Sequence, residues 1–359
     1  MDRPRAAPAI ASGFGLNEEV VGCLTALTIF LAALGAQAAE QPTLVVVVGA
    51  PGAAEYQRQF DAWADRWETA ARQADAKCVR LGRESPDTTS DRDRLAEVLR
   101  DEPKDIEAAL WLVLIGHGTF DGRKAKFNLR GPDVTGTELA EWLQPFKRPL
   151  VVINCASSSA PFINRLSAEN RVVISATKSG YELNFARFGD HLSAAMTQES
   201  ADLDKDEQTS LLEAFLLASR KTQEFYEQEG RLATETALLD DNGDGLGTPA
   251  DWYQGTRAVR QAKDETTVDG QLARLFHLVP NAQEAEMPPA VRRRRDALER
   301  QIAELRQSKG ETTNPDEYYA KLEPLMVELA RLYEELKSAG NGESKAAKPE
   351  NGRGMGARE

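Results

Sequence analysis

Two apolar runs with the character of β-strands constrain this fold most, because each leads into a reactive side chain. Residues 109–115 lead into His117, and residues 150–153 lead into Cys155. Neighbouring parallel strands of an open α/β sheet end at the same edge, where such folds bind ligands. A cysteine beside a histidine is the simplest pair of nucleophile and base. The sequence therefore predicts thiol chemistry at one edge of a sheet.

The surrounding residues alternate between strand and helix patterns. The run 44–49 is dominated by four consecutive β-branched valines, as expected for a strand that is buried on both faces. Phe60, Trp63 and Trp67 follow at spacings of three and four, which predicts an amphipathic helix. Another strand is predicted at 171–175. This alternation predicts an α/β fold with a mostly parallel sheet flanked by helices.

Composition narrows the function classes. The chain has 359 residues, of which 41% are hydrophobic, so most of it can bury a core. Its formal net charge of −13 argues against a nucleic-acid binder, which needs a basic face. We therefore expect no nucleic-acid partner.

The N-terminus has the pattern of an export signal. Residues 20–35 are uncharged and apolar, and Ala36-Gln37-Ala38 follows as a small-x-small cleavage site. This predicts a signal peptide over 1–38 and a periplasmic or secreted protein, with an uncleaved membrane anchor as the alternative. Cys78 and Cys155 remain after cleavage. They could form a disulfide, but a reactive Cys155 would have to stay free.

The residues around the two reactive side chains strengthen the prediction. Gly118 leaves an unencumbered amide directly after His117. Small residues at 156–160 follow Cys155, which suits an accessible thiol and a turn into a helix. A helix N-terminus there would lower the thiol pKa and offer amides to an oxyanion.

On these residues the chain resembles the clan of caspase-like cysteine peptidases, and most closely its legumain-like branch. The resemblance spans about 43–189. It rests on three motifs, which are Leu-Ile-Gly-His-Gly-Thr at 114–119, Val-Val-Ile-Asn-Cys-Ala-Ser at 151–157 and Val-Ile-Ser-Ala-Thr at 173–177. It implies a caspase/legumain-like sheet between helices.

The resemblance also implies a reaction. Cys155 would attack the scissile carbonyl of a peptide or protein substrate, and His117 would act as acid and base. The amides of Gly118 and Cys155 would hold the oxyanion, and catalysis would require no cofactor. Asn154 departs from the acidic or alanine residue often found before the nucleophile, so no triad partner is named.

For specificity, the resemblance points to the segment after the 171–175 strand. Ser175, Thr177 and Glu182 would bind substrate, and Glu182 would favour cleavage after Asn or a basic residue. Arg187 offers the alternative of recognising an acidic residue, as in caspases. A solvated loop carboxylate is the alternative for Glu182.

Two acidic loops, 202–213 and 240–251, space oxygen donors as an EF-hand does. Glu207 stands where the first loop needs a glycine, and the second loop ends on Asp rather than Glu. Oxygen donors favour calcium over zinc, and we expect a structural role for any bound calcium. An acidic surface turn is the alternative for both loops. The candidate ligands are Asp202, Asp204, Asp206, Ser210, Glu213, Asp240, Asn242, Asp244 and Asp251.

The C-terminal part changes character after the peptidase-like domain, which is predicted over 39–279. Residues 280–289 read as a linker. Apolar stripes over 290–337 predict a helical hairpin or coiled coil, where a partner helix or a second copy could bind. Pro324 should start or kink its second helix, and 338–359 should be disordered.

The sequence leaves three functions open. The first is a cysteine endopeptidase that uses Cys155 and His117, cutting after Asn or a basic residue. The second is a catalytically silent caspase-like fold that serves as a protein-interaction scaffold. The third is a thiol hydrolase or transpeptidase with the same pair of residues.

Overall fold

The structure is a computed structural model that describes residues 41–83, 89–261, 268–307, 309 and 314–346. The predicted signal peptide and residues 347–359 of the predicted disordered tail lie outside these ranges. Within the described ranges, no helix combines the length and apolar character that a membrane span requires.

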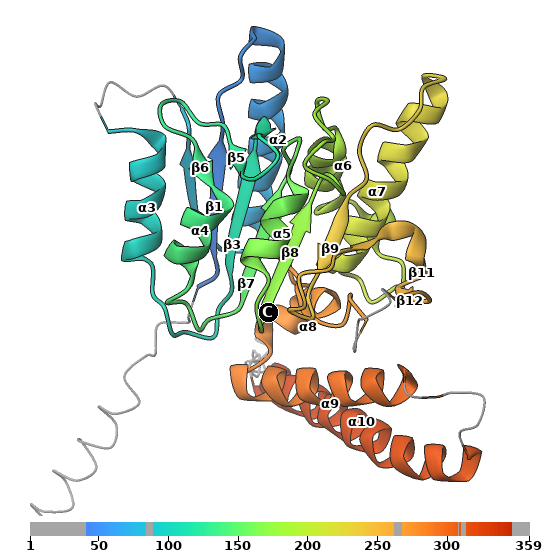
Figure 1. Cartoon of the computed structure of the whole chain (residues 1–359). Helices are drawn as coiled ribbons and strands as arrows, with labels where there is room; N and C mark the ends of the chain where they lie inside the picture. The colour runs from blue at the N-terminus through green and yellow to red at the C-terminus, as the bar shows by residue number, and fades with distance from the viewer. Residues whose placement is uncertain (1–40, 84–88, 262–267, 308, 310–313, 347–359) are drawn as a thin grey trace, which may run out of the picture. The chain divides into compact units, whose positions relative to one another are not determined.

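A seven-stranded sheet forms the centre of the fold, in the order β10-β9-β8-β7-β3-β1-β2 (Figure 1). The strands from β2 to β8 in this order are parallel, and β9 and β10 add an antiparallel edge. This confirms the predicted mostly parallel α/β sheet. The strands are β1 (Thr43–Val48), β2 (Lys77–Leu81), β3 (Leu110–Ile115), β7 (Leu150–Asn154), β8 (Arg171–Ser175), β9 (Leu238–Asp240) and β10 (Thr248–Pro249).

Helices cover both faces of the sheet, as Figure 1 shows. Alternate strand residues supply two hydrophobic cores, so that Val151 and Ile153 face α2, α6 and α7 while Val152 faces α3, α4 and α5. Both faces of the central strands are therefore apolar, as their continuous apolar runs predict. The helices are α2 (Ala54–Gln73), α3 (Asp91–Asp101), α4 (Gly136–Leu143), α5 (Ala160–Leu166), α6 (Phe188–Ala195) and α7 (Leu211–Gln228).

Local signals explain where several helices begin. Phe60, Trp63 and Trp67 of α2 are buried at the predicted spacing. The Ser90 hydroxyl accepts a hydrogen bond from the Asp93 amide at the start of α3, a cap that stabilises a helix by about 1 kcal/mol. The shorter elements are β4 (Gly118–Phe120), β5 (Ala125–Phe127), β6 (Val134–Thr135), β11 (Tyr253–Gln254), β12 (Arg257–Ala258) and the 3₁₀ turns η1 (Glu199–Ala201), η2 (Ala250–Trp252) and η3 (Ala273–Leu275).

The C-terminal region is more helical than predicted. A short helix α8 (Ala282–Glu286) forms inside the predicted linker, because the Asn281 side chain caps it at the Glu284 amide. Two long helices follow, α9 (Pro289–Gln307) and α10 (Pro315–Ala346), and they pack against each other as a hairpin. Of the two alternatives predicted for Pro324, a start or a kink, the start is excluded, because α10 begins at Pro315 and Pro324 lies inside it; the helix continues into the segment predicted to be disordered.

Candidate functional site

The strands that carry the two reactive side chains are direct neighbours. β3 and β7 pair in parallel, with Leu114 opposite Asn154. His117 and Cys155 follow these strands at the same sheet edge, as the sequence predicts. Their exposure and contacts decide which chemistry this edge can perform.

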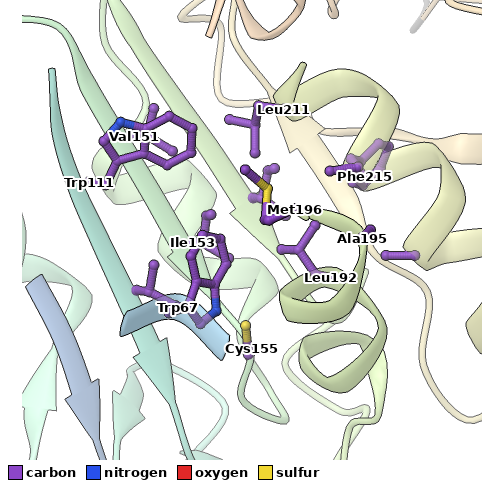
Figure 2. Packing of buried hydrophobic residues seen from close by; sticks show 14 of the residues in the cluster. Trp67, Trp111, Val151, Ile153, Cys155, Leu192, Ala195, Met196, Leu211 and Phe215 are labelled. Carbon is purple, nitrogen blue, oxygen red and sulfur yellow. The ribbon is translucent and has the colours of Figure 1, made fainter. Parts of the chain in front are cut away.

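The Cys155 thiol is enclosed in the core. Its side chain is 0% exposed, and Figure 2 shows it among packed residues that include Trp67 and Ile153. Burial, with a smaller contribution from the charge of Glu235, raises its pKa to about 12. The prediction that the Cys155 thiol is accessible and has a lowered pKa was therefore wrong. Cys78 is exposed, and neither cysteine forms a disulfide.

Strand geometry explains the enclosure. The Cys155 amide donates to the Leu114 carbonyl over 2.9 Å, so the backbone continues the β7 ladder through this residue. Because side chains alternate along a strand, Cys155 joins Val151 and Ile153 on the core face. The next helix begins only at Ala160. The predicted helix N-terminus therefore does not lie at the thiol.

His117 is held among aromatic rings. Its ring lies 4.8 Å from that of Tyr56, 5.2 Å from Phe60 and 5.9 Å from Phe185, between centroids. Its Nε2 atom is 3.2 Å from the Pro51 carbonyl oxygen. Burial lowers its pKa, although the Pro51 contact acts the other way. Within the described ranges no hydrogen bond joins His117 to Cys155, and the imidazole ties the loop after β1 to α2.

Both predicted oxyanion donors are already bonded within the fold. The Gly118 amide donates to Ser157 Oγ over 3.2 Å, and that hydroxyl donates to the Gly118 carbonyl over 3.1 Å. The Cys155 amide donates to the Leu114 carbonyl oxygen. A Cβ atom on residue 118 would lie 2.2 Å from the Ser157 carbonyl oxygen, which explains the glycine. Ser157 thus joins the two strand ends, a role that the sequence did not reveal.

The predicted substrate-binding residues also serve the fold. Ser175 and Thr177 are 0% exposed. The Ser175 hydroxyl donates to the Thr177 carbonyl, and Thr177 Oγ1 accepts from the Ala160 amide. Ser175 and Thr177, which were predicted to bind substrate, instead support the start of α5 and do not line a pocket in this structure.

Glu182 fastens its own loop. Its carboxylate accepts hydrogen bonds from the amides of Lys178 and Thr236, and its carbonyl accepts from the Ser158 amide. Burial raises its pKa. Glu182 is therefore a loop tether in this structure, rather than a group that is free to select a substrate side chain.

Ser158 is the strained residue at this edge. Its φ of 56° lies in the left-handed region, which residues other than glycine adopt at a cost. Its buried hydroxyl has no hydrogen-bond partner among the described residues. Backbone strain of this kind gathers at functional sites, but Ser158 is 1% exposed and cannot reach a solvent-borne substrate.

Glu235 is a structural residue that sequence reasoning missed. It is 4% exposed, and its carboxylate accepts from the amides of Arg187 and Phe188 and from the Tyr226 hydroxyl. It caps the N-terminus of α6, although it lies far along the chain. The Arg187 guanidinium stacks over Phe225 at 4.2 Å.

One exposed surface stands beside the two strand ends, and we call it the lip. Tyr181 and Leu183 are 72% and 61% exposed, and the Tyr181 ring packs against Phe120 of β4 at 5.2 Å. The chain is acidic overall, but basic residues prevail here, with Arg123 and Lys124 at the β4–β5 turn and Lys178 in the loop of Tyr181. The lip thus comprises Tyr181, Leu183, Phe120, Arg123, Lys124 and Lys178.

The first acidic loop gathers three carboxylates. Ligand atoms of Asp202, Asp204 and Asp206 lie within 4.8 Å of one another. Burial and the neighbouring carboxylates, Glu213 first among them, raise the Asp204 pKa to about 6. Glu213 accepts from the amides of Leu203, Asp204 and Ser210 and from the Ser210 hydroxyl, so it caps α7.

The second acidic loop begins at the end of β9. Asp240 is 0% exposed, and its Oδ1 accepts from the Gly243 amide. Asn242 and Asp244 follow, and each accepts a hydrogen bond from an amide two residues further on. Asp251 is exposed and lies in η2.

Comparison with known proteins adds little to this geometry. No family model matches the chain, and no curated protein matches it. The Drosophila initiator caspase Dronc is a similar solved structure, with 14% identity, 58% of this chain and 81% of the caspase covered, and a TM-score of 0.37. Protein GSU0716 from Geobacter sulfurreducens has 11% identity, 58% and 97% coverage, and a TM-score of 0.34. Neither similarity is high enough to carry an inference about activity.

Proposed function

We propose that this chain is a catalytically silent α/β module of caspase-like topology that binds a protein partner at the edge where β3 and β7 end. The observation that carries this proposal is the complete enclosure of Cys155. A cysteine peptidase needs a thiolate that reaches the scissile carbonyl. The thiol here faces the opposite way, into the core between the sheet and α6.

The acidity of the thiol supports the same proposal. With a pKa of about 12, only about one Cys155 side chain in 10⁵ would be ionised at neutral pH. The amides of Gly118 and Cys155 already have acceptors within the fold. An oxyanion would have to displace those acceptors, whereas catalysis depends on donors that are already in place.

The lip supplies the binding surface of the proposal. Exposed Tyr181 offers a rigid aromatic contact, the kind of residue enriched where proteins bind one another. Three basic side chains flank it on a chain whose net charge is −13. This charge pattern favours an acidic, extended segment of a partner protein.

A second candidate function is the cysteine endopeptidase with Cys155 as nucleophile and His117 as acid and base. The placement of both residues after adjacent parallel strands favours it, as does the sequence resemblance. It requires the start of α6 to move, because Gly189 lies against the thiol. This would be a large rearrangement of a packed helix.

Two measurements on the full chain separate these functions. Peptides with Asn, Arg, Lys or Asp before a fluorogenic bond should show no turnover above that of Cys155→Ala. Iodoacetamide should label Cys78 in the native protein and Cys155 only after denaturation. Turnover that disappears in both Cys155→Ala and His117→Ala, with unchanged circular dichroism, would overturn the silent assignment.

The binding part of the proposal has its own test. Fluorescence anisotropy with acidic peptides of extended sequence should show binding that weakens with salt. It should weaken further in the double variant Tyr181→Ser with Leu183→Ser. Leu232→Ser is the matched control, because Leu232 is 91% exposed on a different loop. The proposal that the lip is the docking surface would be contradicted if the double variant and the control bound acidic peptides equally. It would also be contradicted if the wild type bound basic peptides as well as acidic ones.

A further inference from the structure

The lip is carried by a short loop whose exposed side chains have little packing of their own. Tyr181 and Leu183 are 72% and 61% exposed. Gly180 lies so close to the Phe120 ring that a Cβ atom on residue 180 would come within 2.5 Å of it. The loop therefore rests on β4 through its backbone. Side-chain burial contributes little to holding Tyr181 and Leu183 in place.

Glu182 stands between these two exposed residues and fastens the loop to two other segments of the chain. Its carboxylate accepts hydrogen bonds from the Lys178 amide over 2.9 Å and from the Thr236 amide over 3.2 Å. Its carbonyl accepts from the Ser158 amide over 2.9 Å. Ser158 lies between β7 and α5, and Thr236 lies just before β9. One residue therefore holds the loop to both of its neighbouring segments.

The hydrogen bonds of the Glu182 carboxyl group are compatible with a proton on it. Both amides donate to the same oxygen, Oε2. Among the described residues no donor bonds to Oε1, so a proton there leaves both bonds in place. Burial raises the pKa of Glu182, although the two amides and the charge of Lys178 act the other way. On the facing segment before β9, Glu235 directs its carboxylate to the start of α6 instead.

We propose that Glu182 is the positioning residue of the lip, and that its protonation holds the lip more firmly in mildly acidic solution. This inference rests on the proposed function, because the lip is the surface proposed to bind an acidic, extended segment of a partner. A surface that is already in place loses less conformational freedom on binding and so binds more tightly. The tether of Glu182 thus sets how well Tyr181 and Leu183 are presented.

The direction of the pH effect follows from the linkage between proton binding and loop closure. A carboxyl group with a higher pKa in the fastened loop than in the open loop takes up a proton as the loop fastens. The fastened loop is therefore favoured as the pH falls through the raised pKa of Glu182, and the effect is complete below about 4.5, the usual value. At higher pH the ionised carboxylate bears the cost of burial, so the loop opens more often.

Hydrogen exchange at the Lys178 and Thr236 amides of the full chain tests the tether without any partner. Glu182→Gln keeps an oxygen that can accept both bonds but carries no charge, so it should protect both amides at every pH. Glu182→Ala removes the acceptor and should lower the protection of both amides by about tenfold. Wild-type protection should lie below that of Glu182→Gln at pH 8 and approach it as the pH falls to 5. The comparison with Glu182→Gln cancels the intrinsic pH dependence of exchange.

Glu169→Ala is the matched control, because Glu169 is an exposed glutamate in the turn before β8, and it should leave both amides protected as in wild type. Fluorescence anisotropy then measures binding of an acidic peptide, and the affinity of wild type relative to Glu182→Gln should rise as the pH falls. The titration of the peptide itself cancels in this ratio. Unchanged protection in Glu182→Ala would overturn the inference, and so would wild-type protection that equals that of Glu182→Gln at every pH. Protection that follows the pH as expected, in a chain that binds no acidic peptide, would refute the proposed function alone.

Discussion

The Cys155 side chain lies directly against the backbone of Gly189. A Cβ atom built on residue 189 would come within 2.7 Å of Cys155 Cβ and 3.0 Å of its Sγ atom. The same atom would lie 2.9 Å from Trp63. This contact closes the thiol off from solvent, and it makes residue 189 the clearest place to test the enclosure.

Gly189→Ala should lower the free energy of unfolding by about 1–3 kcal/mol, because an added methyl group overpacks this core. Chemical denaturation measures the change. The variant Cys155→Ala removes the sulfur, so Gly189→Ala should cost less in that background, and a double-mutant cycle should show coupling. Additive effects would mean that the two side chains are not in contact in solution.

Sequence reasoning could place Cys155 at a strand end but could not choose its face. Leu150 to Ile153 is apolar throughout, as is natural for a strand that is buried on both sides. Such a run contains no period-two signal that would say which face Cys155 joins. The cover over the thiol comes from Gly189 of α6, and its position depends on packing rather than on local pattern.

The same limit applies to the carboxylates. Glu182 and Glu235 were visible in the sequence only as a loop acid and an unremarked glutamate. Their partners, Thr236 for Glu182 and Phe188 for Glu235, lie about fifty residues away along the chain. The mostly parallel character of the sheet, by contrast, follows from the alternation of strand and helix runs and was predictable. Caps such as Ser90 were also predictable, because the cap and the amide that it accepts from lie only three residues apart in the sequence.

Ser158→Gly should stabilise the protein by about 1 kcal/mol. Glycine adopts the left-handed conformation of residue 158 without strain, and the change also removes a buried hydroxyl without a partner. Thermal denaturation followed by circular dichroism measures the effect. Ser157→Gly is the control, since that hydroxyl bonds to Gly118 and its loss should destabilise. A destabilised Ser158→Gly would show that the hydroxyl has a partner in solution.

Acid should weaken the fold partly through Glu138. Burial raises its pKa, but hydrogen bonds from Thr135 and Arg92 outweigh this effect and lower it to about 2, from a usual value of 4.5. The contribution of Glu138 to the free energy of unfolding is therefore fully present above about pH 4.5 and is lost as the pH falls toward 2. Because Glu138 is only partly buried and solvent screens its interactions, we expect it to contribute about 1 kcal/mol to the free energy of unfolding.

Glu138→Gln should flatten the acid limb of the stability profile, measured by urea denaturation between pH 2 and 5. Glu141→Gln, on the same helix but exposed, should leave that limb as in wild type. An unchanged acid limb in Glu138→Gln would show that the capping box does not hold the carboxylate in its charged form.

Glu235→Ala should loosen the cover over Cys155. The change leaves the amides of Arg187 and Phe188 and the Tyr226 hydroxyl without their acceptor, at a cost of about 1–3 kcal/mol. Because those amides begin α6, the helix that carries Gly189, local opening should become more frequent and native labelling of Cys155 by iodoacetamide should accelerate. Glu229→Ala, an exposed glutamate at the end of α7, should change neither stability nor labelling. If Cys155 stays unlabelled in Glu235→Ala while stability falls, the thiol is covered by elements other than the start of α6.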